Sequence, residues 1–160
     1  MRVNTGKPDS SDWTLAVTIE SYRQLVHFGK KLNVRVLVEN HGGISSDPTI
    51  ILRLLRAVNS FYFFRLAPDF GNFEPSTRYD GLRMLMPNAY VVHAKTYAFD
   101  EHGEETRFDF GECMRIVRDS RFPGPLSIEY EGEGDQYEGI AQSITLVRRH
   151  LAAVPSTQAS

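Results

Sequence analysis

Four polar residues stand where apolar, strand-like stretches of the sequence end, and each has a side chain that can bind a metal ion: Glu39, Asp69, His93 and Glu129. The stretches before them are rich in valine, leucine, isoleucine or phenylalanine, a composition typical of strands that are buried on both faces. Carboxylate oxygens together with one imidazole nitrogen suit a divalent cation such as Mn²⁺, Mg²⁺, Co²⁺ or Zn²⁺. The pattern therefore predicts a divalent metal site.

Each of these residues also has an ordinary structural interpretation. A single carboxylate at the end of a strand usually caps a helix or accepts hydrogen bonds from a loop, and a single histidine is as often structural as functional. The metal hypothesis depends on the repetition of the pattern in consecutive strands. In parallel sheets the carboxyl ends of the strands lie at one edge, and in a barrel they converge on one point.

The elements that would position these residues alternate regularly along the chain. A strand-like start at Arg2–Asn4 is followed by helix and strand patterns in turn, with a charged hairpin at 99–107. Strands are expected at 34–39, 61–66, 88–95 and 126–130, and helices at about 15–29, 48–58, 79–85 and 109–119, with a last helix that includes 140–151. Regular alternation of this kind predicts an α/β fold with a parallel sheet.

Composition excludes several classes of function. The chain has 160 residues, enough for one domain, and its net charge of -2 gives no basic surface for nucleic acid. The sequence has no apolar run of about 18 residues, so we expect no membrane span. The single cysteine, Cys113, fits a reducing compartment, and we expect the protein in the cytoplasm.

Other polar residues lie close in sequence to the four predicted ligands. Lys95 shares a strand face with His93, which would place a cation beside the imidazole. His41 could contact a substrate or stabilise a turn, and Asn72 could be a substrate group or a turn residue. Glu131 is in phase with Glu129 but one step further out, and we expect it at the rim of the site.

Four segments of the sequence, taken together, resemble those of a known protein family. Glu39–Gly43, Asp69–Phe73, His93–Lys95 and Leu126–Gly132 resemble the second half of the xylose isomerase-like TIM barrel superfamily, which includes sugar isomerases, epimerases and endonuclease IV-like proteins. The resemblance implies that residues 1–154 form the C-terminal half of a (β/α)₈ barrel, strands 4–8, followed by a flexible tail at 155–160. A full barrel takes about 250 residues. Two expectations follow from the shorter length: the chain is a truncated or split gene product, or a further copy or a second chain completes the barrel.

The resemblance also implies a chemistry. In the family, Glu39, Asp69, His93 and Glu129 match the metal ligands, and in the ketose epimerases the two matching glutamates transfer protons. The implied function is a metal-dependent isomerase or epimerase that acts on a sugar, or on a polyol-derived keto sugar, through an enediolate. Many members carry a histidine at the position of Asn72, and Lys95 matches a substrate contact.

Two alternatives stay open. One is an endonuclease IV-like phosphodiesterase, in which Asp100 and His102 would form an Asp-x-His element. The other is a half-barrel without catalytic activity.

Overall fold

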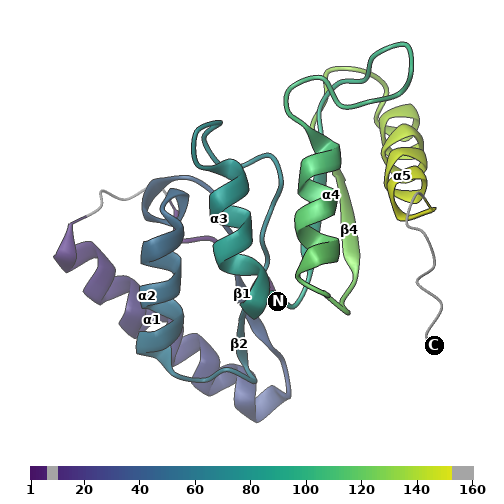
Figure 1. Ribbon diagram of the computed structural model, residues 1–160. Helices are drawn as coiled ribbons and strands as arrows, with labels where there is room; N and C mark the ends of the chain where they lie inside the picture. Colours follow the sequence, from purple (N-terminus) through teal and green to yellow (C-terminus); the bar gives the residue numbers. More distant parts are fainter. Residues whose placement is uncertain (7–10, 153–160) are drawn as a thin grey trace, which may run out of the picture.

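The computed structural model describes residues 1–6 and 11–152, and it has an α/β fold (Figure 1). Its elements, in chain order, are α1 (Asp12–Leu32), β1 (Val36–Val38), the 3₁₀ turn η1 (Gly43–Ser46), α2 (Pro48–Val58), β2 (Phe64–Leu66), α3 (Arg78–Leu85), the 3₁₀ turn η2 (Met86–Asn88), β3 (Val92–Thr96), α4 (Phe110–Asp119), β4 (Leu126–Tyr130) and α5 (Gln136–Ala152). The predicted alternation of helices and parallel strands is confirmed.

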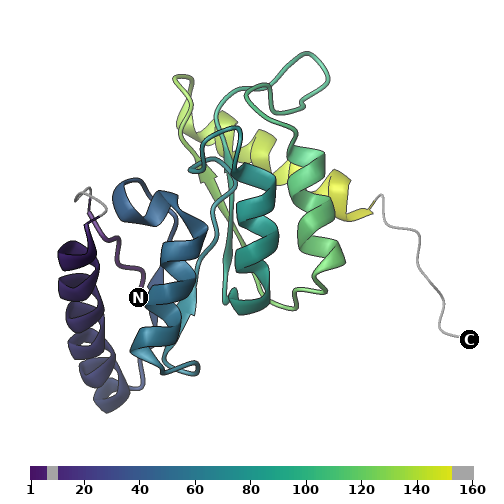
Figure 2. The same ribbon diagram turned by 60° about the vertical axis from the view of Figure 1, so that its left-hand side comes forward.

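The strands form a parallel series in chain order. β1 pairs with β2 and β3 pairs with β4. Single parallel bridges join the two pairs, Leu66 to Ala89 and Asp69 to His93, and a further bridge places Arg2 beside Leu37. Each helix packs against the next one along the chain (Figures 1 and 2). This arrangement is a partial TIM barrel, as the sequence predicted.

The two faces of the sheet differ in polarity. Residues on one face are buried among the helices and belong to the hydrophobic core: Val36, Val38, Phe64, Leu66, Val92 and Ala94. The residues that alternate with them, which face the inside of the partial barrel, include Arg65, His93, Lys95 and Glu129. Because side chains alternate along a strand, the same short segments build the core and a polar inner wall.

Helix starts follow the capping patterns in the sequence. The Asp47 side chain accepts from the Thr49 N–H, with Pro48 at the first position of α2. Asp109 accepts from the Glu112 N–H at the start of α4. α1 is longer than expected, since Ser11 caps its start and Asn33, with a φ of 54°, ends it.

The strands are shorter than the sequence suggested. We predicted a strand from Phe61, but residues 61–63 form a turn in which the Phe63 and Phe64 N–H groups donate to the Ser60 carbonyl. We also predicted strand from residue 88, where Pro87 and the η2 turn delay β3 until Val92. The charged hairpin is present, with an antiparallel bridge between Phe99 and Glu105. The tail expected at 155–160 lies outside the described residues.

Within the described ranges, no helix combines the length and the apolar character that crossing a bilayer requires.

Burial predicts which aromatic residues support the fold. Phe64 is fully buried in β2 and its ring lies 5.0 Å from that of Tyr22, whereas Phe61 is 50% exposed. We expect Phe64→Ala to lower the free energy of unfolding by about 3–5 kcal/mol. The matched variant Phe61→Ala should change it by about 0.5 kcal/mol. Urea denaturation followed by circular dichroism measures both, and equal losses would contradict the described core.

Candidate metal centre

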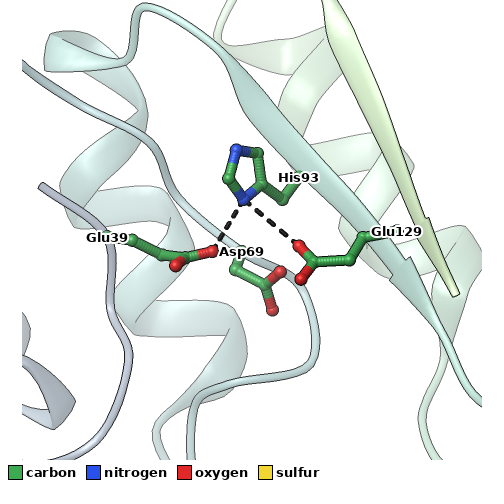
Figure 3. Close-up of side chains that lie close together, drawn as sticks. All are labelled: Glu39, Asp69, His93 and Glu129. Carbon is green, nitrogen blue, oxygen red and sulfur yellow. Dashed lines mark hydrogen bonds and ion pairs between the residues drawn. The ribbon is translucent and has the colours of Figure 1, made fainter. Parts of the chain in front are cut away.

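Side chains from the ends of four strand regions meet at one point. Each of Glu39, Asp69, His93 and Glu129 offers one ligand atom, and these atoms all lie within 4.8 Å of one another (Figure 3). Glu39 directly follows β1, and Asp69 follows β2 and bridges to His93 of β3. Glu129 lies in β4. Three of the four are buried, and the Glu129 side chain is 27% exposed.

His93 lies between the two glutamates. Its Nδ1 is 2.6 Å from Glu39 Oε1 and 3.4 Å from Glu129 Oε2, and Figure 3 shows both carboxylates approaching this one nitrogen, Glu39 from the left and Glu129 from the right. Burial disfavours the charged imidazole, but hydrogen bonds with Glu129 and Glu39 outweigh burial and raise the pKa of His93 to about 9. The hydrogen bond with His93 is the largest cause that lowers the pKa of Glu129 to about 2. Glu129 is therefore held as a carboxylate.

Hydrogen bonds hold both the backbone of Asp69 and one of its carboxylate oxygens in place. Oδ1 accepts from the Gly71 and Asn72 N–H groups, at 2.8 and 2.9 Å. The buried amide of Asn40 accepts from the Asp69 N–H and donates to the Asp69 carbonyl. Burial raises the pKa of Asp69 to about 7, although Lys95 acts in the opposite direction. These contacts leave Oδ2 pointing into the cluster with no hydrogen bond of its own (Figure 3).

The cluster has the chemistry that a divalent cation requires. Among the described residues, Glu39 Oε2 and Asp69 Oδ2 are buried and lack a hydrogen-bond partner. A buried carboxylate oxygen without a partner is unfavourable, and binding a cation is one way to satisfy it. Carboxylate oxygens with one imidazole nitrogen suit the divalent ions of the first transition row and magnesium. The residues therefore fit a metal centre.

Lys95 extends the cluster on one side. Its side chain is fully buried, and Nζ donates to Asn72 Oδ1 and to Glu131 Oε1, both at 3.0 Å. It also lies 3.7 Å from Asp69 Oδ2 and 3.6 Å from Glu129 Oε1. Burial opposes its charge, yet these carboxylates raise its pKa above the usual value. A permanent cation therefore stands beside the predicted ligands, as the strand pattern suggested.

Arg2 contacts the cluster from the other side. Its Nη1 lies 3.1 Å from Glu39 Oε1, 3.1 Å from His93 Nδ1 and 3.6 Å from Glu129 Oε2. The Arg2 side chain is 39% exposed. The bridge to Leu37 places it at the first edge of the sheet. This residue therefore adds a second positive charge to a group of carboxylates.

The remaining candidates lie around this centre. Asn72 acts in the turn through its N–H, as one interpretation expected, and its side chain accepts from Lys95, while a contact with substrate stays a prediction. His41 is partly exposed in the loop after β1, and its N–H donates to the Ser45 hydroxyl. Asp100 and His102 do not join the cluster. Asp100 accepts from the His102 and Glu104 N–H groups in the hairpin turn, and the His102 side chain is 76% exposed.

Two contacts that shape the centre were not predicted from the sequence. Arg2 and Asn40 contact it across 37 and 29 positions of sequence, and only the folded chain shows these contacts. Glu131 was expected at the rim, and its side chain is indeed 47% exposed, but it also forms an ion pair with Lys95. Its phase with Glu129 was a signal in the sequence. For Arg2 the signal was its position in the strand-like stretch Arg2–Asn4.

Known structures share this fold. The chain superposes on D-allulose 3-epimerase from a Methylomonas species with a TM-score of 0.73 and 13% identity, over 89% of this chain and 58% of the other. The chain also superposes on the probable 3-DHS dehydratase AsbF of Bacillus anthracis. The TM-score is 0.67 and the identity is 19%, over 91% of this chain and 60% of the other. The chain also superposes on a xylose isomerase-like TIM barrel protein of Mycobacterium smegmatis in complex with magnesium. The TM-score is 0.64 and the identity is 15%, over 92% of this chain and 54% of the other.

Two curated relatives are similar over a shorter stretch. The 3'-dehydrocarminate deglycosidase alpha subunit of a Microbacterium species is 36% identical over 70 residues, 41% of this chain and 20% of that subunit. The C-glycoside deglycosidase alpha subunit of Arthrobacter globiformis is 35% identical over 65 residues, 41% of this chain and 18% of that subunit. The aligned stretch thus spans about a fifth of each curated relative, and the chain spans 54–60% of the solved structures described above.

A family assignment covers much more of the chain than these pairwise alignments. The sequence profile of the xylose isomerase-like TIM barrel matches residues 2–150, which include all four residues of the candidate metal centre. This chain belongs to the xylose isomerase-like TIM barrel family.

Proposed function

We propose that this chain forms the metal-binding and proton-transfer part of a sugar isomerase or epimerase. The observation on which the proposal rests is the convergence of Glu39, Asp69, His93 and Glu129 from successive strand ends. Similar proteins of known structure include an epimerase and a magnesium complex, and these support the proposal. The substrate would be a sugar, or a keto sugar derived from a polyol.

The four residues would hold one divalent cation, Mn²⁺, Mg²⁺, Co²⁺ or Zn²⁺. When bound, such an ion polarises a carbonyl and a neighbouring hydroxyl group of the substrate and makes the C–H bond between them more acidic. The chain itself supplies the ligands in a rigid form, because Asp69 is fixed by backbone hydrogen bonds and Glu39 is fully buried.

The two glutamates would transfer the proton. Glu129 lies at the carboxyl end of β4 with a partly exposed carboxylate, so it can reach a substrate carbon and accept a proton from it. Glu39, the other carboxylate next to His93 Nδ1 (Figure 3), would return a proton to the other face of the substrate. The Lys95 ammonium would balance the negative charge that develops on the substrate oxygen. Asn72 and His41 would contact the substrate hydroxyl groups.

A second candidate reaction begins with the same step, the removal of a proton from the substrate. The curated relatives are named as deglycosidase subunits, and their 35–36% identity exceeds that of the solved structures described above. In a deglycosidase, removal of a proton beside a carbonyl would be followed by loss of the sugar's substituent instead of return of the proton. Glu129 would accept the proton in either reaction.

We also propose that further β/α units cover the open ends of the partial barrel. The exposed apolar residues of α1, Trp13, Val17, Phe28 and Leu32, lie within an arc of about 100° on the helix. β4 pairs only with β3 among the described strands. Uncovered apolar stripes and parallel edges favour association. A second copy or a different chain could supply these units, and the relatives named as alpha subunits support the second source.

Metal binding tests the centre itself. We expect the purified chain to bind about one equivalent of Mn²⁺. Asp69→Asn should abolish binding or weaken it at least ~10-fold, because the amide loses the charge that the cation requires. Isothermal titration calorimetry measures both. Asp119→Asn, a change of the same type at a 70% exposed side chain, is the control. Unchanged binding in the Asp69 variant would contradict the assignment.

Hydrogen exchange tests the proton transfer. With D-allulose in D₂O, the Mn²⁺-loaded chain should replace the hydrogen next to the carbonyl with deuterium, as followed by proton NMR. Glu129→Gln should slow this exchange by about 10²–10⁴-fold, because the amide cannot accept a proton. Glu133→Gln, in the loop before α5, should keep the original rate. If the wild-type chain catalyses no exchange, or the Glu129 variant retains the full rate, the proposed chemistry is wrong.

Solution mass tests the coverage of the open ends. A chain of 18.2 kDa with exposed apolar stripes should associate as its concentration rises, either with itself or with a supplied partner. Light scattering over a range of concentrations measures the mass. A mass that stays at 18.2 kDa throughout would contradict self-association.

A further inference from the structure

Arg2 contacts three of the four candidate ligand residues with a single nitrogen. Its Nη1 lies 3.1 Å from both Glu39 Oε1 and His93 Nδ1 and 3.6 Å from Glu129 Oε2. A guanidinium remains charged at all ordinary pH values and has no acceptor atom. Its position is therefore that of a cation that neutralises the two carboxylates, Glu39 and Glu129.

A divalent cation would need the same side chains as ligands, together with Asp69. The guanidinium and the metal ion carry like charge, and both require lone pairs of Glu39 and Glu129. Occupying the centre with one cation therefore raises the free energy of placing the other there. The Arg2 side chain can move aside because it is 39% exposed. The backbone beside it is held separately, by the hydrogen bond from the Val3 N–H to the Leu37 carbonyl.

We propose that Arg2 is an internal counter-ion that competes with the metal for the centre and thereby sets the metal affinity. The proposal rests on the metal centre described above. Lys95 cannot have the same role to the same degree, because its side chain is fully buried and is held by Asn72 and Glu131. Arg2 is thus the cation that metal binding would displace, while Lys95 stays in place.

The test is the Mn²⁺ affinity of Arg2→Gln measured on the full chain by calorimetry. We expect binding about tenfold tighter than in the wild type, which corresponds to about 1.4 kcal/mol. Arg53→Gln removes the same charge from a surface ion pair, with Asp12 at 3.6 Å, and should leave the affinity unchanged. Equal or weaker binding by Arg2→Gln would overturn the proposal.

Thermal unfolding supplies a second measurement that does not depend on activity. With EDTA present, Arg2→Gln should unfold at a lower temperature than the wild type, because the carboxylates lose a counter-ion. The increase in unfolding temperature on addition of saturating Mn²⁺ should be larger in the variant. An equal increase in both proteins would contradict the competition.

The remaining outcomes separate this proposal from the proposed function. If the wild type binds Mn²⁺ and the Arg2 variant binds it no more tightly, only the counter-ion role is wrong. If neither protein binds Mn²⁺, both proposals fail. If only the variant binds, the competition is stronger than expected and the proposal stands. Should Arg2→Gln not fold, Arg2→Met replaces it: the long but uncharged side chain should give tighter binding than the wild type, and unchanged affinity would overturn the proposal.

Discussion

The main constraint on this structure is that three carboxylates lie close together in a small, mostly buried volume. Glu39 and Asp69 are fully buried and Glu129 is close to both. Carboxylates taken out of water repel one another, and the group is stable only if cations or protons compensate the charge. The chain supplies His93 in the middle, Lys95 on one side and Arg2 on the other. Burial raises the pKa of Asp69 to about 7, Lys95 acts in the opposite direction, and the neighbouring Glu39 and Glu129 add to the increase.

The parallel sheet is the reason why these groups meet. Each strand contributes apolar side chains to the core with one face and polar side chains to the inner wall with the other. Because all strands run in the same direction, their carboxyl ends lie together, and the loops that follow them add the final contacts. Asn40 links the end of β1 to the backbone of Asp69 in the next strand region, so the position of one ligand depends on the neighbouring strand.

Much of this arrangement could be predicted from the sequence, because it depends on local patterns. Apolar runs ending in Glu39, Asp69, His93 and Glu129 placed these residues at strand ends, and alternation placed Lys95 beside His93. The contacts of Arg2 and Asn40 could not be predicted, since they join residues far apart in sequence through side chains whose direction only tertiary packing determines. The strand expected from Phe61 was wrong because hydrogen bonds to the Ser60 carbonyl favour a turn there, although phenylalanine and tyrosine have high strand propensity.

The most direct test of the account is a crystal structure of the chain with Mn²⁺, with the ion located by its anomalous scattering. One strong anomalous peak is expected, and the Mn²⁺ ion that it marks should lie within bonding distance of four side chains: Glu39, Asp69, His93 and Glu129. A strong peak elsewhere, or an ordered cluster that shows no anomalous signal at saturating Mn²⁺, would contradict it.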